Sequence, residues 1–313
     1  MKNFFFLYLI FTSVLVGQES NDKIVYLDSL DRETSKENHV FYRVVKDYYL
    51  NLPEYQIKEY YKSGALKTEG LSLTRERNAY KSEWISYHEN GNKKSTINYE
   101  KGRPNGRIEQ WHENGNKRMI GEYTISNYDD LVYELKIQQF WDSNNVQKVI
   151  DGNGEYEEIE PHSISTGKVK NGYKEGEWRG RNPIAKYTFV EFYENRNLVS
   201  GKSIDSLNTE YNYTKVFLPP RPKKGIEHFY KYIAKKFRIP KKHGYIDGKI
   251  ILDFVIDKDG SITNVRILKG MNEEYNNEAI RLISEYPDWG SGELRGIKIK
   301  TSYSIPITFR SDE

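Results

Sequence analysis

A short pattern recurs along the middle of this chain: an aromatic residue, a turn with glycine or asparagine, and then a basic or polar run. The three clearest copies place the turn at Gly64, Gly91 and Gly115, and weaker copies lie at 140–148 and 192–199. The spacing between turns is the length of one β-hairpin with its connections. Because an isolated hairpin cannot bury an apolar face of its own, the pattern predicts antiparallel hairpins stacked side by side.

We expect this hairpin array to occupy residues 57–205. In its turns, glycine or asparagine would supply the positive φ that a type I′ hairpin requires. A second kind of turn lies between the repeats, at 101–106 and at 171–178. The chain also contains 26 tyrosines, and tyrosine is common in strands that are packed on one face and exposed to solvent on the other. Composition and turn spacing therefore both indicate a mainly β chain.

Two sequence elements in this region carry a family likeness. Tyr-x-x-x-Gly at 60–64 and Gly-x-x-x-Gly-x-Trp at 172–178 resemble MORN-type repeats, in the bacterial variant found in proteins labelled YwqK-family antitoxins. The resemblance implies hairpins stacked into one elongated, twisted sheet. It implies little about activity, because such a repeat is a scaffold. A ribbon of this kind exposes aromatic and basic side chains and suits the binding of an extended partner.

The last part of the chain, residues 225–313, carries a different pattern in the order helix, strand, strand, helix, strand. Apolar residues at helical spacing predict the two helices, which end at Pro240 and Pro287. An Asp-Gly turn at 257–260 joins the first two strands as a hairpin, and the last strand is expected within 297–309. We therefore expect a small α+β module with a three-stranded sheet and two helices.

This C-terminal module resembles the TonB carboxy-terminal domain. The resemblance covers about a third of the chain, and it is carried by residues 229–234, 248–250, 254–262, 277–280, Trp289 with Gly292, and 303–309. The run 289–292 departs from the family, which places a proline between its tryptophan and glycine, and we expect a looser loop there. The resemblance implies a recognition mode in which a partner peptide adds a strand to an exposed sheet edge.

The last strand, residues 296–309, is the candidate edge. Proline lacks an amide hydrogen and is tolerated mainly on edge strands, and Pro306 lies late in this segment. Strand addition at this edge predicts the following partner-binding residues: Lys298, Lys300, Ser302, Tyr303 and Ser304. An alternative interpretation is that the two lysines only guard an open edge against aggregation.

The amino terminus predicts export. Lys2 precedes an apolar run from Phe4 to Gly17, which is short for a bilayer span and typical of a secretory signal. We assign residues 1–18 to this signal, with an uncleaved anchor helix as the alternative, and leave 19–56 as an unassigned lead-in. The chain has no cysteine, which excludes a cysteine-linked lipid anchor, disulfides and thiolate chemistry. The expected location is the periplasm, with association with the outer membrane as the alternative.

Between the array and the module, residues 206–224 contain Pro219, Pro220 and Pro222 and are expected to form a short, stiff linker. The stretch from Leu218 to His243 is basic, and the alternative is that it attracts an acidic partner or an anionic lipid surface. A polyproline helix gains only about 3 Å per residue, so this linker is far too short to cross a periplasm. Because an energy transducer needs such a spacer, we do not expect the module to transmit force.

Several residue groups invite a chemical interpretation, and each has a structural alternative. His88 and His112 recur beside a glutamate, and their repeated position indicates hairpin surface residues rather than a metal or acid–base pair. Asp257 opens a run that lacks the later ligands of a calcium loop, and Asp151 opens a glycine-rich turn. The sequence has no nucleophile elbow, phosphate loop or His-Glu-x-x-His motif. We therefore expect no catalytic residue, no metal site and no cofactor.

The expected function is that of a non-enzymatic exported protein of the Gram-negative cell envelope that binds a protein or peptide partner. One alternative is an envelope structural protein whose repeats bind lipid or polysaccharide, and another is a TonB-type energy-transduction or transport accessory protein. An enzyme with an unrecognised site is the third. A net charge of +3 does not favour nucleic acid as a partner. Any association with a membrane would be mediated by the partner protein. The sequence does not determine the oligomeric state.

Overall fold

The computed structural model of the 313-residue chain describes residues 21–29, 31–77, 79–125, 133–240 and 246–309. The chain divides into two compact units, Met1–Gly152 and Asn153–Glu313. The export signal predicted at residues 1–18 lies outside the described residues. Within the described ranges, no helix combines the length and the apolar character that crossing a bilayer requires.

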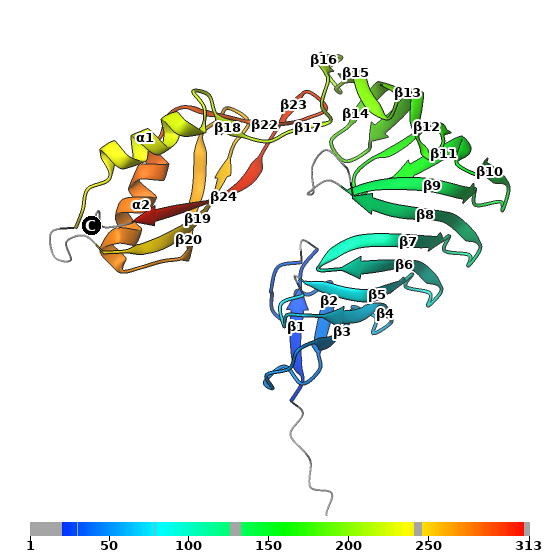
Figure 1. Cartoon of the computed structure of the whole chain (residues 1–313), viewed down its shortest axis with the longest axis horizontal. Coiled ribbons are helices and arrows are strands. Elements are labelled where there is room, and N and C mark those ends of the chain that lie inside the picture. Colours follow the sequence, from blue (N-terminus) through cyan, green and yellow to red (C-terminus); the bar gives the residue numbers. More distant parts are fainter. Residues whose placement is uncertain (1–20, 30, 78, 126–132, 241–245, 310–313) are drawn as a thin grey trace, which may run out of the picture. The chain divides into compact units, whose positions relative to one another are not determined.

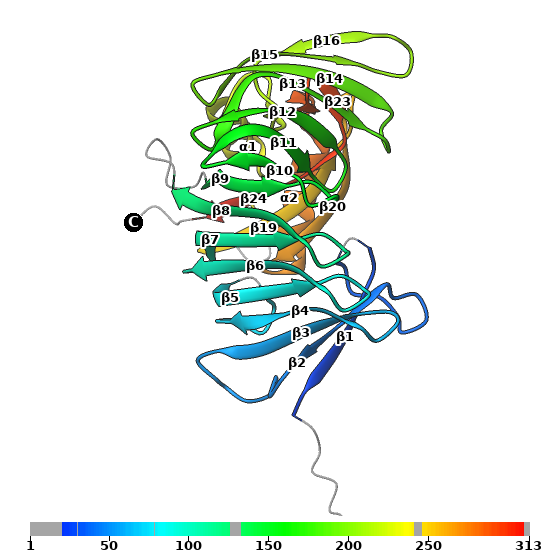
Figure 2. The same ribbon diagram turned by 90° about the vertical axis from the view of Figure 1, so that its right-hand side faces the viewer.

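The first unit is an antiparallel meander, in which each strand pairs with the next one along the chain (Figure 2). The predicted mainly β hairpin array is thereby confirmed. The lead-in that the sequence left unassigned at 19–56 also forms strands of this meander, so the strands start well before residue 57. The strands are β1 (Lys23–Leu27), β2 (Phe41–Val45), β3 (Tyr55–Tyr61), β4 (Leu66–Ser72), β5 (Tyr80–Tyr87), β6 (Lys93–Glu100), β7 (Arg103–Trp111), β8 (Lys117–Ile125), β9 (Tyr133–Trp141) and β10 (Gln147–Ile150).

The second unit begins with hairpins of the same kind, and its first strands also pair in chain order. They are β11 (Asn153–Ile159), β12 (Ile164–Lys170), β13 (Tyr173–Asn182), β14 (Tyr187–Glu194), β15 (Asn197–Ile204) and β16 (Glu210–Tyr213). Glycines on these strands leave room for aromatic rings. At Gly167, a Cβ atom would lie 2.5 Å from the ring of Trp178, its partner in the β12–β13 register. The Trp178 ring is fully buried there, and its Nε1 donates to the carbonyl of Lys168 at 3.0 Å.

The turns at Gly64, Gly91 and Gly115 differ from the predicted type I′ geometry. In the second of them, the Gly91 amide donates to the His88 carbonyl, and the His88 amide donates to the Asn92 carbonyl. Only the glycine has a positive φ, of 88°, whereas a type I′ turn needs two such residues. These are three-residue turns that close on one left-handed glycine, so the type I′ prediction is wrong for them. Two consecutive positive φ values do occur in the second kind of turn, for example at 101–102 and 171–172.

The predicted order helix, strand, strand, helix, strand is confirmed for the C-terminal module. The main elements are α1 (Ile226–Lys236), β19 (Gly248–Ile256), β20 (Ile262–Lys269), α2 (Glu273–Glu285) and β24 (Thr301–Phe309). The sheet order is β20–β19–β24, and both helices cover one face of this sheet (Figure 1). The buried core joins the two helical stripes to the inner face of β19, with Phe229, Phe254 and Tyr275 fully buried.

The last run of the sequence does not form one strand. It divides into β23 (Ile297–Ile299) and β24, with Lys300 between them, because the two parts pair with different neighbours. β23 pairs with β22 (Gly292–Leu294), whereas β24 pairs with β19. A single alternating pattern cannot reveal this change of partner, because the alternation of side chains is the same in both strands.

The segment predicted as a linker is partly folded into the module. Its residues form β17 (Phe217–Leu218), which pairs with β22, and β18 (Arg221–Pro222), which pairs with β21 (Trp289–Gly290). Pro220 and Pro222 are buried. The run 289–292 therefore lies in paired strands rather than in the looser loop that the missing proline predicted. Trp289 is fully buried in the core of the module.

Candidate functional site

The outer side of β24 is the candidate site. β24 pairs with β19 along its whole length, from Thr301 opposite Ile256 to Phe309 opposite Gly248, without a register shift. Within the described ranges of the chain, no strand pairs with its other side, because β24 is the last strand of the three-stranded sheet. A straight edge of this kind presents a row of backbone amide and carbonyl groups that can accept another strand.

The opposite edge of the sheet, on β20, is less regular. Its pairing with β19 shifts register twice, between Ile251 and Leu252 and between Asp253 and Val255. Asn264 in the middle of β20 has a φ of 53°, a left-handed conformation that bends a strand. Irregularities of this type protect an edge against strand addition. β24 is therefore the better of the two edges for a partner strand.

Pro306 indicates which backbone groups of β24 face outward. Backbone groups alternate in direction along a strand, and proline cannot donate to a ladder. Residues that lie two or four positions from Pro306 along β24 are therefore expected to direct their backbone amides and carbonyls away from β19, as Pro306 does. These residues also expose their side chains, and they are Ser302, Ser304 and Thr308. Three short hydroxyl side chains thus accompany the open edge.

Not all of the predicted partner-binding residues lie on this edge. Ser302, Tyr303 and Ser304 belong to β24, whereas Lys300 precedes it and forms an ion pair with Asp257 at 3.1 Å. Lys298 lies on β23, which pairs with β22 in the separate sheet of β17, β22 and β23. The structure therefore places three of the five residues in β24 and Lys300 directly before it, whereas Lys298 lies in a different strand.

The two residues that follow Ser302 also have structural partners. The Tyr303 ring faces inward and lies 5.0 Å from the Trp289 ring, measured between centroids. The Ser304 hydroxyl donates to Oδ1 of Asp253 on β19 at 2.9 Å. Of the side chains predicted to bind a partner, Ser302 is therefore the exposed one on the edge that forms no side-chain hydrogen bond with another described residue.

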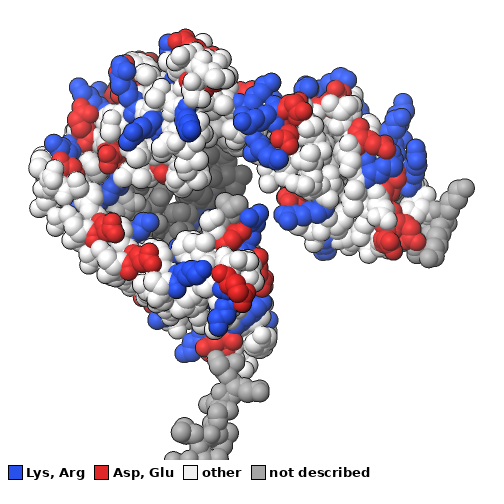
Figure 3. Space-filling view, turned by 180° about the vertical axis from the view of Figure 1, so that it is seen from behind, with Lys and Arg blue, Asp and Glu red and all other residues white. Residues whose placement is uncertain are grey.

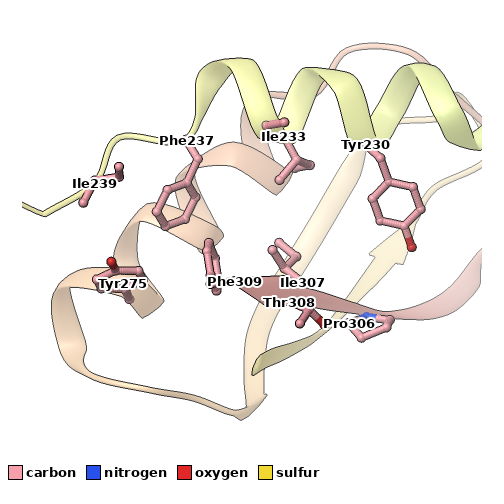
Figure 4. A pocket seen from close by; sticks show the side chains of 10 residues that line it. Tyr230, Ile233, Phe237, Ile239, Tyr275, Pro306, Ile307, Thr308 and Phe309 are labelled. Atoms are coloured by element: carbon pink, nitrogen blue, oxygen red, sulfur yellow. The ribbon is translucent and has the colours of Figure 1, made fainter. Parts of the chain in front are cut away.

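Beside the edge lies a pocket that the sequence pattern did not predict. It has a volume of about 580 Å³ and lies between the second half of α1 and the end of β24 (Figure 4). Its wall on the helix side includes Tyr230 and Ala234, and its wall on the strand side includes Pro306, Ile307 and Phe309. The sequence periodicity predicts the helix and the strand that form the two walls. The space between the walls depends on how α1 packs on the sheet, which the periodicity does not predict. We call it the α1–β24 pocket.

A second group of polar side chains is buried where the β22–β23 turn meets β14 and β16. Glu191 and Arg295 are 0% and 3% exposed, and Glu191 accepts hydrogen bonds from the hydroxyls of Tyr193 and Tyr213 at 2.9 and 3.0 Å. Burial raises the pKa of both tyrosines, and the Glu191 carboxylate raises it further. Burial works against the charge of Arg295, but Glu191 raises its pKa overall. Each of these four side chains has a hydrogen-bond partner within the group, as expected of a stable buried polar network.

Each of the two recurring histidines lies at hydrogen-bond distance from a backbone carbonyl of the next repeat. Nε2 of His88 lies 3.0 Å from the carbonyl oxygen of Trp111, and Nε2 of His112 lies 2.9 Å from that of Trp141. Each histidine thus links its own turn to the aromatic residue of the following repeat. Across the described parts of the chain, no three histidine, aspartate or glutamate residues are grouped in a way that could hold a metal ion. The calcium-like run at Asp257 is a hairpin turn closed by a left-handed glycine.

The comparison with known proteins concerns the part of the chain that carries the edge and the pocket. No curated protein and no solved structure gives a significant match to the chain. Residues 241–311, which include β19, β20, α2 and β24, match the family described as the Gram-negative bacterial TonB protein C-terminal. The module that presents the β24 edge is thus similar to the C-terminal domain of TonB, a protein of the Gram-negative envelope.

Proposed function

We propose that this chain is a non-enzymatic, exported binding protein of the Gram-negative cell envelope. Its C-terminal module would capture a segment of a partner protein by strand addition. The observation that carries the proposal is the regular outer edge of β24, unpaired among the described strands, in a module similar to the TonB C-terminal domain. The signal pattern at residues 1–18 supports the periplasm as its location.

Strand addition fits the local chemistry of the edge. The outward backbone groups near Ser302, Ser304 and Thr308 would bond to the added strand, and such bonds supply affinity that does not depend on the partner's sequence. The side chains beside these groups are short hydroxyls, so a second backbone can approach closely. Pro306 leaves a gap in the row of donors, which favours one register of the added strand over others.

We propose that the hairpin array is a scaffold that carries the module and offers a second binding surface. Its resemblance to MORN-type repeats supports this role. Lysine and arginine are interspersed with aspartate and glutamate on the faces of both units shown in Figure 3, which does not favour nucleic acid as the partner. The alternative is a structural protein whose repeats contact lipid or polysaccharide. Salt-dependent sedimentation of the protein with vesicles or cell-wall fragments separates the two.

A TonB-type transport accessory protein is the second candidate, and the family match favours it. A force-bearing version of this role would need a long extended spacer between an anchor and the module. Part of the segment 206–224 is instead paired in β17 and β18. The proposal of a binding protein therefore does not include energy transduction.

The strand-addition proposal is tested with a display library of random octapeptides selected on the immobilised full chain. We expect enriched peptides whose binding slows backbone hydrogen exchange along β24. Ser302→Pro removes an outward amide and should abolish binding of the enriched peptides, whereas the matched control Ser302→Ala should retain it. Equal binding by both variants, with each folded as judged by circular dichroism, would contradict the proposal.

A further inference from the structure

The α1–β24 pocket lies where it can influence which peptide adds to the β24 edge. The inference drawn from it rests on the proposed function. The strand-side wall of the pocket is formed by residues of the edge strand itself, including Ile307 and Phe309. On the helix side, the Tyr230 ring points down toward Pro306 from α1 (Figure 4). A strand added to β24 would therefore pass directly beside the pocket opening.

The alternation of side chains decides which residues of an added strand reach this space. Ile305, Ile307 and Phe309 point toward the helices, and Ser304 and Thr308 point away from them. In an added strand, the residue directly opposite Ile307 would face the same side as Ile307. Its side chain would enter the pocket between the strand and α1, while its neighbours would face solvent.

Most of the residues that line the pocket have apolar or aromatic side chains, and several of them are open to solvent. Tyr230 is 45% exposed and Ile239 is 38% exposed, and Ala234 is also exposed. A volume of about 580 Å³ lies within the range of sites that hold ligands of appreciable size. A bulky apolar side chain would fill this space and remove the exposed groups from water, whereas a small or charged one would not.

Charge favours an acidic neighbour for that side chain. Lys231 and Lys235 lie one helical turn apart, on the exposed stripe of α1 next to Tyr230 and Ala234. Both are exposed, and neither forms an ion pair among the described residues. Glu227 lies one turn before Lys231, so the stripe keeps a net positive charge. These ammonium groups would attract an added strand that carries a carboxylate near its apolar residue.

We infer that the α1–β24 pocket selects the captured strand: it accepts an extended peptide with one bulky apolar residue opposite Ile307 and an acidic residue beside it. A second copy of β24 fits this description poorly. Its sequence, residues 301–309, contains no acidic residue, and it would place Pro306 in both strands of the ladder. A peptide segment of another protein is therefore the occupant that the surface favours.

The test uses the octapeptides enriched on the full chain, remade as synthetic peptides whose binding is measured by fluorescence polarisation. We expect enriched sequences to share a bulky apolar residue with an acidic neighbour. Replacing the apolar residue by alanine should weaken binding at least about tenfold, and added salt should weaken binding of the acidic peptides. Ala234→Trp fills the pocket and should remove the apolar preference. Lys236→Trp adds the same ring on another side of α1 and should leave the preference intact.

The outcomes separate this inference from the proposed function. If Ala234→Trp binds the same peptides as the wild type while Ser302→Pro does not, the pocket is not selective and the inference fails alone. If Ser302→Pro binds them too, or if no peptide is enriched, both fail. Sedimentation velocity adds a further check. A dimer that Ser302→Pro dissociates would identify a second copy as the occupant and overturn the inference.

Discussion

Arg295 and Glu191 are 104 positions apart in the sequence, and Nε of Arg295 donates a hydrogen bond to Oε1 of Glu191 at 2.9 Å. The Arg295 guanidinium also lies 3.8 Å from the centroid of the Phe189 ring, and its backbone amide donates to the carbonyl of Val216. The turn between β22 and β23 is thereby held against the end of the hairpin strands β14 to β16. Within the second unit, the C-terminal module is attached by packed side chains as well as by the chain itself.

Arg295→Met should destabilise the second unit by about 3–5 kcal/mol, because it leaves the Glu191 carboxylate buried without its cation. Urea unfolding measures this change. The double variant with Glu191→Gln should recover part of the loss, since the unpaired charge is then removed. Lys202→Met, in an ion pair whose two side chains are 45% and 53% exposed, is the control and should leave stability nearly unchanged. Wild-type stability of Arg295→Met would show that the pair is not needed.

Gly167→Ala should destabilise the hairpins of the second unit by about 1–3 kcal/mol, because the new methyl group overlaps the Trp178 ring. The buried indole cannot move away without breaking its hydrogen bond to Lys168. Thermal unfolding followed by tryptophan fluorescence reports the loss. At Gly290 a Cβ would meet nothing closer than 3.4 Å, so Gly290→Ala is the matched control. Equal melting temperatures for the two variants would argue against the glycine–tryptophan contact.

Stability should fall at high pH, and the titration of Tyr99 should contribute to this fall. Burial, and then the neighbouring Tyr80 and Tyr123, raise the pKa of Tyr99 from 10.0 to about 12. A group whose pKa is raised on folding contributes stability that is complete below the unfolded pKa and disappears as the pH passes the folded pKa. The loss should therefore occur between about pH 10 and pH 12.

Urea unfolding at a series of alkaline pH values, together with the ultraviolet absorbance of tyrosinate, measures this effect. Tyr99→Phe should reduce the alkaline loss, because phenylalanine has no proton to release. Tyr49, which is 66% exposed, provides the control variant Tyr49→Phe, and that change should not alter the profile. A Tyr99→Phe profile identical to that of the wild type would exclude Tyr99 as the cause.

His88→Ala should cost about 1 kcal/mol of stability in the first unit, because the carbonyl of Trp111 loses its side-chain partner. The same change should not affect the binding of zinc, measured by titration calorimetry, if the histidine is structural. His162→Ala, at an exposed position, serves as the control for both measurements. Zinc binding that His88→Ala abolishes would favour the metal interpretation instead.

Local sequence patterns were sufficient for the longer elements of the fold. β19 ends just before the predicted turn at 257–260, and β20 begins just after it. α2 ends two residues before Pro287, whereas α1 ends at Lys236, four residues before Pro240. The turn glycines marked the hairpins, although the geometry of their turns was assigned wrongly. The short strands β17, β18, β21 and β22 were missed, because strands of two or three residues are too short to show a period.

The sequence by itself determined a β-hairpin array followed by an α+β module whose last strand tolerates Pro306, because periodicity and turn chemistry act between neighbouring residues. Only the tertiary structure decided that Lys298 lies away from the β24 edge, that the expected linker pairs with the module, and that Arg295 meets Glu191. It also decided the α1–β24 pocket. These features depend on the packing of segments that lie far apart in the chain, and no local pattern records which distant segment will supply the other wall of a pocket or the partner of a charge.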